Sequence, residues 1–317
     1  MTTKLLITGG AGFIGCNLIA HLAARGGYRI TVLDNETMGT CSEIDTPGVR
    51  FLHGDIRDTA ALTAALAGQD AVVHLAAETR VADSIADPEG TFAVNAEGSF
   101  RLLQAARAAG VARVVAASTG GAILGEATAP IDETMAARPL SPYGASKLAM
   151  EGYLSAFAGA YRMRTCALRF SNVYGPRSHR KGSVVAQFFR ALLHDEPLVI
   201  YGDGTQVRDY LYVGDLVEGV RRALETGAGG VYQLGSGQGT TLNDLAAAMA
   251  RVVGLKNVPL RYEPFRVGEV HTTWCAIDRA RAAFAFQAAT GLDEGLARTW
   301  AWFRAEFGAH LRHSLSS

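Results

Sequence analysis

The chain has 317 residues, of which 49% are hydrophobic and 19% charged, a composition typical of a folded protein with a substantial core. Lys plus Arg and Asp plus Glu are balanced at 30 each, so no overall charge draws the chain to nucleic acid or to an anionic membrane surface. No apolar run approaches the roughly 18 residues that a membrane helix needs. The first ten residues also lack the pattern of a signal peptide, so we expect a cytoplasmic protein.

Short runs rich in β-branched residues alternate with longer helical stretches in the first half of the chain. The strand-like runs cover residues 4–8, 29–33, 71–75 and 113–117, and the helical stretches cover 14–24, 92–109 and 144–161. This alternation predicts an α/β fold in which a doubly wound parallel sheet carries helices on both faces. Such a sheet binds ligands beyond the carboxyl ends of its strands, near the point where strand order reverses.

The pattern becomes less regular after about residue 172, which predicts a second, smaller α/β lobe interleaved with the first. A strand at 230–234 and a helix at 213–224 are expected to return to the main sheet, whereas 241–253 predicts a separate capped helix. We therefore expect a cofactor-binding domain over residues 1–172 and 210–236, and a substrate-binding lobe over 173–209 and 237–310.

A glycine-rich turn, GGAGFIG at residues 9–15, joins the first strand to the first helix. Glycines permit a tight turn and a close backbone approach, and the helix amino terminus offers N–H groups and a positive dipole end to a pyrophosphate. The candidate dinucleotide-binding residues in this turn are Gly9, Gly12, Phe13, Ile14 and Gly15. Glycine-rich turns also arise from geometry alone, so the assignment needs a second motif.

Two aspartates near the ends of the following strands supply that support. Asp34 closes the second strand nineteen residues after Gly15, where a carboxylate can accept both ribose hydroxyls and repel a 2′-phosphate, which favours NAD over NADP. Asp55, followed by Ile56, comes after the next strand and is a candidate to receive the adenine amino group. Capping of a helix or turn is the alternative role for either aspartate.

Tyr143 and Lys147 are four residues apart, so both side chains lie on one face of the helix that starts there. Tyrosine normally holds its proton until about pH 10, but a nearby ammonium and the positive nicotinamide ring of NAD lower that pKa. Tyr143 can then act as a general base, and Thr119, at the end of the 113–117 strand, can orient the same substrate hydroxyl. Such a pair also occurs on ordinary amphipathic helices; the cofactor motif in the same chain favours catalysis.

Together these residues resemble the extended short-chain dehydrogenase/reductases, in particular the NAD-dependent epimerase/dehydratase group that acts on nucleotide sugars. The likeness covers nearly the whole chain and includes HLAA at 74–77, RFSNVYGP at 169–176 and GDGTQVRDY at 202–210. It implies a Rossmann domain, a Thr119–Tyr143–Lys147 triad and NAD that stays bound through turnover. Further cofactor contacts implied by the resemblance are Asn35, Leu75, Ala76, Ala77, Asn95 and Phe170, and the implied substrate contacts besides Thr119 are Asn172, Arg208 and Arg266.

The segment after Thr119 separates the reactions of this family. Classical 4,6-dehydratases carry Asp-Glu there, an acid and a base that remove water across C5 and C6, whereas this chain has Gly120 and Gly121. The resemblance therefore implies a C4 epimerase that acts on a UDP-hexose through a transient 4-keto sugar. Leu124, where most relatives have tyrosine, is a departure. The alternatives are a dehydratase or decarboxylase with the same intermediate, Glu126 being a candidate base, and a non-catalytic NAD-binding scaffold or sensor.

A homodimer is also expected from the resemblance. The stretches 92–109 and 144–161 resemble helices that form a four-helix dimer interface in the family. The apolar side chains available for it are Leu102, Leu103, Leu148, Leu154 and Phe157, with core packing inside one subunit as the alternative. No His/Cys/Asp cluster in the sequence suggests a metal site, so we expect none.

Overall fold

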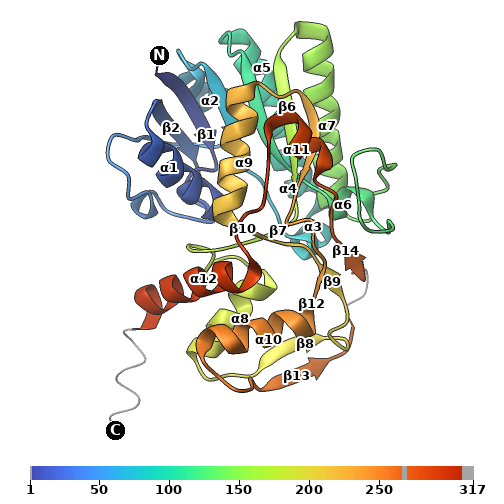
Figure 1. The fold of residues 1–317 in the computed structure, drawn as a ribbon. Helices are drawn as coiled ribbons and strands as arrows, with labels where there is room; N and C mark the ends of the chain where they lie inside the picture. The colour runs from blue at the N-terminus through green and yellow to red at the C-terminus, as the bar shows by residue number, and fades with distance from the viewer. Residues whose placement is uncertain (1, 266–269, 309–317) are drawn as a thin grey trace.

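The computed structural model describes residues 2–265 and 270–308, and Figure 1 shows a sheet flanked by helices above a smaller lobe. Seven parallel strands form the sheet in the order β11-β6-β5-β4-β1-β2-β3. Their bounds are β1 Thr3–Thr8, β2 Tyr28–Asp34, β3 Arg50–His53, β4 Ala71–His74, β5 Arg113–Thr119, β6 Arg164–Phe170 and β11 Gly230–Leu234. The predicted doubly wound parallel sheet is confirmed, and strand order reverses between β1 and β4.

The sheet is buried on both faces, which explains the continuous apolar runs of its strands. Along β1, Leu5 and Ile7 belong to one core cluster and Leu6 to another, because successive side chains of a strand point to opposite faces. The first cluster packs against α1 (Phe13–Arg25), α9 (Val213–Thr226) and α11 (Asp278–Phe284). The second packs against α2 (Thr59–Leu66), α5 (Ser99–Ala108) and α7 (Pro142–Tyr161).

The side chains expected to form a dimer interface lie inside this second cluster. Leu102, Leu103, Leu154 and Phe157 are each at most 5% exposed and are part of the core between α5, α7 and the sheet. The expectation that these four side chains face another subunit is therefore wrong, because α5 and α7 turn them towards their own sheet. Leu148 is only partly buried and packs against the first cluster.

The helical stretch predicted at 92–109 is interrupted. A short helix α4 (Pro88–Phe92) leads into a π-helical turn over Ala93–Gly98, and α5 follows directly. Asp87 begins this run, since its carboxylate accepts a 2.9 Å hydrogen bond from Gly90 N. π-helical turns are often found at functional sites, and this one carries Asn95.

The smaller lobe is built from segments that follow residue 172 in the chain (Figure 1). Its elements are β8 (Leu198–Tyr201) paired with β13 (Leu260–Glu263), the three-stranded sheet of β12 (Thr240–Thr241), β9 (Val207–Arg208) and β14 (Thr272–Thr273), and helices α8 (Val184–Leu193), α10 (Leu242–Val253) and α12 (Leu292–Phe307). Thr241 caps α10 by accepting a 3.0 Å bond from Asp244 N, which confirms the predicted capped helix. The pair β7 (Asn172–Tyr174) and β10 (Tyr210–Tyr212) connects this lobe to the sheet.

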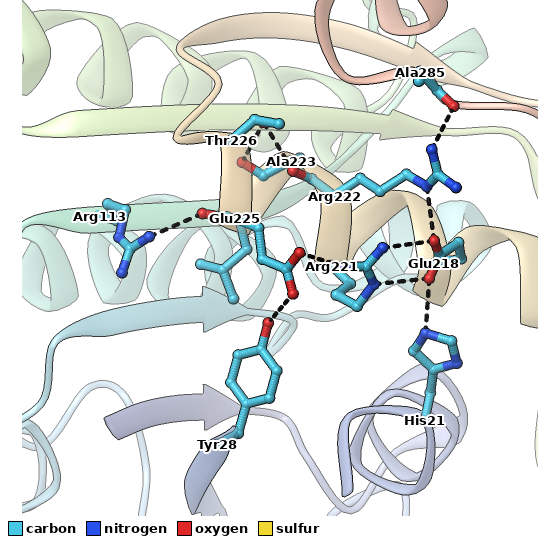
Figure 2. Close-up of polar contacts among 11 residues, drawn as sticks. His21, Tyr28, Arg113, Glu218, Arg221, Arg222, Ala223, Glu225, Thr226 and Ala285 are labelled. Carbon is cyan, nitrogen blue, oxygen red and sulfur yellow. Dashed lines mark hydrogen bonds and ion pairs between the residues drawn. The ribbon is translucent and has the colours of Figure 1, made fainter. Parts of the chain in front are cut away.

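Helix α9 returns from the smaller lobe to the main sheet, and an ion-pair network holds it there (Figure 2). Glu218 accepts bonds from Arg221 at 2.7 and 2.8 Å and pairs with His21 of α1 at 3.0 Å. Glu225 pairs with Arg221 and accepts a 2.7 Å bond from the Tyr28 hydroxyl of β2. The Arg221 bonds hold the pKa of Glu218 well below its usual range. The network ties α9 to two elements from the start of the chain.

Candidate active site

The glycine-rich turn lies at the carboxyl end of β1, where strand order reverses. Gly9 has φ +70°, and a Cβ there would lie 2.6 Å from the backbone nitrogen of Ala76, so only glycine fits. A Cβ at Gly15 would lie 2.5 Å from the carbonyl oxygen of Gly10, which packs the first turn of α1 against the loop. Gly12 caps α1 without a side-chain acceptor. The first N–H groups of α1 are thus presented by a turn that an anion can approach closely.

Asp34 is fixed beside this turn at the end of β2. Its two carboxylate oxygens accept hydrogen bonds from the backbone nitrogens of Ala11 (2.9 Å) and Glu36 (2.8 Å). Burial raises the pKa of Asp34, and the two backbone bonds oppose that shift. The carboxylate keeps further lone pairs and stands next to the glycine-rich turn, as a ribose-binding carboxylate should.

The residues expected at the adenine end are linked to one another. Asn35 donates a 2.9 Å bond to Asp55, whose carboxylate also forms a bidentate pair with Arg57 at 2.8 and 2.9 Å. The bonds from Arg57 hold the pKa of Asp55 well below its usual range. Ile56 is 4% exposed and packs against Gly98 of the π-helical turn. Asp55 is therefore an ionised acceptor whose orientation Arg57 sets, and the Ile56 side chain belongs to the core.

Asn95 lies behind the loop that follows β4, which contains Leu75, Ala76 and Ala77. Its side chain accepts a 2.8 Å bond from Glu78 N and donates to Glu78 O at 2.8 Å and to Ser146 of α7 at 3.1 Å. Asn95 has no exposed surface. It therefore fixes the loop from behind, and the backbone of Leu75 and Ala76 lies against Gly9 of the glycine-rich turn.

The three candidate catalytic residues meet at the carboxyl end of β5. Ser141 caps α7 by accepting a 3.2 Å bond from Gly144 N, so the helix begins just before Tyr143. A Cβ at Gly144 would lie 2.1 Å from the carbonyl oxygen of Ala122, so glycine allows α7 to approach α6 (Gly121–Leu124) closely. This approach brings Tyr143 to Thr119, the last residue of β5, whose side chain lowers the pKa of Tyr143.

Burial governs the proton equilibria of the pair on α7. It raises the pKa of Tyr143 to about 12, against a smaller lowering by the Thr119 side chain. It lowers the pKa of Lys147 to about 8, against a raising effect of the Glu151 charge. Lys147 is 3% exposed and donates a 3.0 Å bond to the carbonyl oxygen of Ala117. Tyr143 therefore needs positive charge close by before it can lose its proton near neutral pH.

The segment after Thr119 is closely packed at Gly120 and carries no acid or base at either Gly120 or Gly121. A Cβ at Gly120 would lie 2.6 Å from Oε1 of Gln233, a residue with no exposed surface. Leu124 is 1% exposed and packs in the core, whereas Glu126 is exposed. Leu124 therefore contributes to the packing of the core, and the Glu126 side chain is solvated. Phe170 lies beside Thr119 in the sheet register.

Asn172 and Arg208 line one cavity of about 210 Å³ between β7, α8, β8 and β10. Arg208 donates bonds to the carbonyl oxygens of Val207 (2.9 Å) and His271 (3.0 Å). Gln187, Tyr201 and Tyr210 also line this cavity and were not anticipated from the sequence. They come from three separate elements; Tyr210 ends the GDGTQVRDY motif, but no local motif marks Gln187 or Tyr201. The Tyr210 hydroxyl is buried with no hydrogen-bond partner within residues 2–265 and 270–308. Arg266, the fourth expected substrate contact, lies outside the described residues.

Two features are absent from the described part of the chain. No helix in it is long and apolar enough to span a bilayer. Nor do three or more His, Cys, Asp or Glu side chains gather there in a way that would hold a metal ion.

Comparison with known proteins places this geometry in a family. The model of the "NAD dependent epimerase/dehydratase family" matches residues 5–235. A UDP-glucose 4-epimerase of Mycolicibacterium smegmatis is 37% identical over 311 residues, which cover 95% of this chain and 98% of that protein. Among solved structures, the UDP-glucose 4-epimerase of Thermotoga maritima with UDP-glucose is 36% identical, with a TM-score of 0.91 over 96% of this chain and 99% of that chain. A dTDP-glucose 4,6-dehydratase of Streptomyces venezuelae with NAD bound is 33% identical, with a TM-score of 0.90 over 97% of this chain and 98% of that chain. The chain therefore belongs to the NAD-dependent epimerase/dehydratase family.

Proposed function

We propose that this protein is an isomerase that interconverts the C4 epimers of a nucleotide sugar, a UDP-hexose, with NAD as its bound cofactor. The observation that carries the reaction type is the pair of glycines, Gly120 and Gly121, that follows Thr119. The triad for oxidation at C4 is assembled, while positions 120 and 121, where the dehydratases of the family carry an acid and a base, are glycines. Epimerase relatives of similar length agree with this assignment.

NAD fits the residues at the carboxyl edge of β1 and β2. The turn at Gly9 and Gly15 leaves the α1 amino terminus open to a pyrophosphate. We assign Asp34, which is bonded to this turn through Ala11, to the adenosine ribose, and Lys147 to the nicotinamide ribose. A 2′-phosphate would meet the Asp34 carboxylate, which favours NAD over NADP. When bound, NAD supplies a reversible acceptor for the hydrogen on sugar C4, which gives a transient 4-keto sugar.

The residues of the chain supply proton transfer and position. Tyr143 removes the proton of the C4 hydroxyl, and its phenolate is stabilised by the Lys147 ammonium and by the positive charge of the bound cofactor. Thr119, at the end of β5 beside Tyr143, orients the same substrate hydroxyl. The 4-keto sugar turns about its diphosphate tether, and Tyr143 then returns the proton to the alcohol formed on the opposite face.

The cavity next to Asn172 suits the nucleoside diphosphate of the substrate. Arg208 presents several fixed donors to phosphate oxygens, and the buried hydroxyl of Tyr210 lacks a partner among the described residues. We assign cofactor binding to a domain of residues 1–172 and 210–236, and substrate binding to a lobe of residues 173–209 and 237–310.

We also propose that the protein works in the cytoplasm as a homodimer. The dimer proposal rests on the family resemblance and on aromatic side chains of α7 that point outward: Tyr153 is 43% and Tyr161 48% exposed. Burial of such rings is a common source of interface energy. Light scattering should give twice the chain mass of 33.5 kDa, and a monomer at micromolar concentration would reject the dimer.

Incubation of the purified protein with a panel of nucleotide sugars, followed by NMR, tests the function. We expect a mixture of C4 epimers of unchanged mass from at least one UDP-hexose. A product lighter by water or carbon dioxide would identify a dehydratase or decarboxylase, and no turnover of any sugar with NAD bound would favour a scaffold or sensor.

A further inference from the structure

A buried ion pair lies one helical turn beyond Lys147. Glu151 of α7 and Arg169 of β6 are 6% and 5% exposed and form a bidentate pair with N–O distances of 2.9 and 2.8 Å. Ser118 of β5 donates a 2.6 Å bond to the same carboxylate. None of the three belongs to the expected cofactor or substrate contacts, and they lie on the sheet face that α7 covers.

We propose that Glu151, held by Arg169 and Ser118, is a positioning residue for catalysis: it fixes α7 to the end of β5 and supplies the negative charge that keeps Lys147 an ammonium ion. The inference rests on the proposed function for its catalytic consequence. Its electrostatic content can be measured in the protein without turnover.

The geometric part follows from two adjacent residues of β5. Lys147 bonds to the carbonyl oxygen of Ala117, and Glu151 bonds to the hydroxyl of Ser118. Thr119 is the next residue along the strand. Two consecutive turns of α7 are thus attached to the strand just before its catalytic end, which holds Tyr143 and Thr119 in register with each other.

The electrostatic part follows from the charges around Lys147. Burial lowers the pKa of Lys147, and Glu151 is the charge that raises it. On the β4 side the neighbour is His74, whose pKa is lowered to about 3 by burial and by Lys147, so it is neutral and offers no compensation. Tyr143 is neutral until it reacts, and Arg169 is a second cation. Without Glu151, Lys147 would lose its proton more readily and could no longer stabilise the Tyr143 phenolate.

A role in stability alone accounts poorly for the pair. Removing two ions from water is costly, and replacing a buried ion pair by apolar side chains of similar volume is often neutral or stabilising. The guanidinium is also incompletely satisfied, since Nη1 of Arg169 is buried without a partner in the described part of the chain. A charged pair at this place is therefore better explained by its effect on the neighbouring Lys147.

The test uses the small number of lysines in the chain: Lys4, Lys147, Lys181 and Lys256. In protein labelled with ¹³C at lysine Cε, NMR titration gives the protonation midpoint of each, and Lys147→Arg identifies the Lys147 signal. Glu151→Gln should lower the Lys147 midpoint by about one pH unit. Lys181 is the internal control, because burial alone lowers its pKa, also to about 8, and its midpoint should not move.

Glu151→Gln leaves Arg169 unpaired and can destabilise the fold, so a double variant, Glu151→Met with Arg169→Met, provides a second arm. It removes both charges at similar volume, and the Lys147 midpoint should still fall, by less than in the single variant. Ser118→Ala keeps the charge and should leave the midpoint in place. In turnover, the alkaline limb of kcat should move to lower pH in Glu151→Gln with KM little changed. An unmoved or raised Lys147 midpoint in both charge variants would overturn the inference, whether or not any sugar is turned over.

Discussion

Two glycine-to-alanine substitutions in the glycine-rich turn should separate an effect on cofactor binding from an effect on folding stability. A Cβ at Gly12 would lie 3.4 Å from its nearest neighbour, the Gly9 carbonyl oxygen, and the backbone there (φ −76°, ψ 172°) suits any residue. Gly12→Ala should change the free energy of unfolding of the cofactor-free protein by about 1 kcal/mol or less, since a weaker cap and a stiffer unfolded chain oppose each other. The added methyl group would stand between the α1 amino terminus and the pyrophosphate. Overpacking of about 1–3 kcal/mol would weaken NAD binding by about 5- to 150-fold.

Gly15→Ala should behave differently. Its Cβ would lie 2.5 Å from the oxygen and 2.6 Å from the Cα of Gly10, backbone atoms that cannot yield without opening the loop. We expect a loss of about 1–3 kcal/mol in folding stability together with the loss of NAD binding. Gly159→Ala, on an open face of α7, is the control and should keep both properties.

Urea denaturation of the stripped proteins and calorimetric titration with NAD measure the two effects. Wild-type affinity in Gly12→Ala would show that the pyrophosphate does not rest on this turn. Wild-type stability in Gly15→Ala would contradict the packing described here.

Two further predictions concern the triad and the α9 network. Tyr143→Phe should abolish turnover and retain NAD, because the proton chemistry is lost while the ring still packs. In the wild type, the Tyr143 phenol has a pKa of about 12 in the free protein, and ultraviolet titration should show it losing its proton at lower pH once NAD is bound. No change in this titration on NAD binding would refute the assignment. Glu218→Gln should cost roughly 1–3 kcal/mol at pH 7, measured by urea denaturation. Because the Arg221 bonds depress the folded pKa of Glu218, the stabilisation is present above its unfolded pKa of about 4.3 and is lost as pH falls below it, so wild type and variant should converge in acid. A constant difference down to pH 3 would count against the network.

The fold could be predicted because its signals are local. The β-branched runs mark strands, the glycine-rich turn marks the end of β1, and the four-residue spacing places Tyr143 and Lys147 on one helix face. The capping threonine of α10 is also visible in the sequence.

The remaining features depend on contacts between distant segments. Gln187, Tyr201 and Tyr210 come together in the cavity from α8, β8 and β10, and no spacing rule connects them. The apolar periodicity of α5 and α7 shows that Leu102 and Leu154 need burial, but periodicity does not say whether the sheet or another subunit provides it. The role of Glu151 depends on Arg169, eighteen residues away on another element.

The fate of a label on sugar C4 tests the central claim most directly. We would supply a UDP-hexose carrying deuterium at C4 and follow it by NMR. In C4 epimerisation, hydrogen leaves C4 and returns to C4 without exchange with solvent. The product of the labelled sugar should therefore keep its deuterium at C4 and have an unchanged mass. Unlabelled sugar turned over in deuterium oxide should gain no carbon-bound deuterium. A 4,6-dehydratase would eliminate water across C5 and C6 and deliver the C4 hydrogen to C6. Deuterium at C6, solvent label at C5, or a product lighter by water would contradict the epimerase assignment and make Glu126 the first residue to replace.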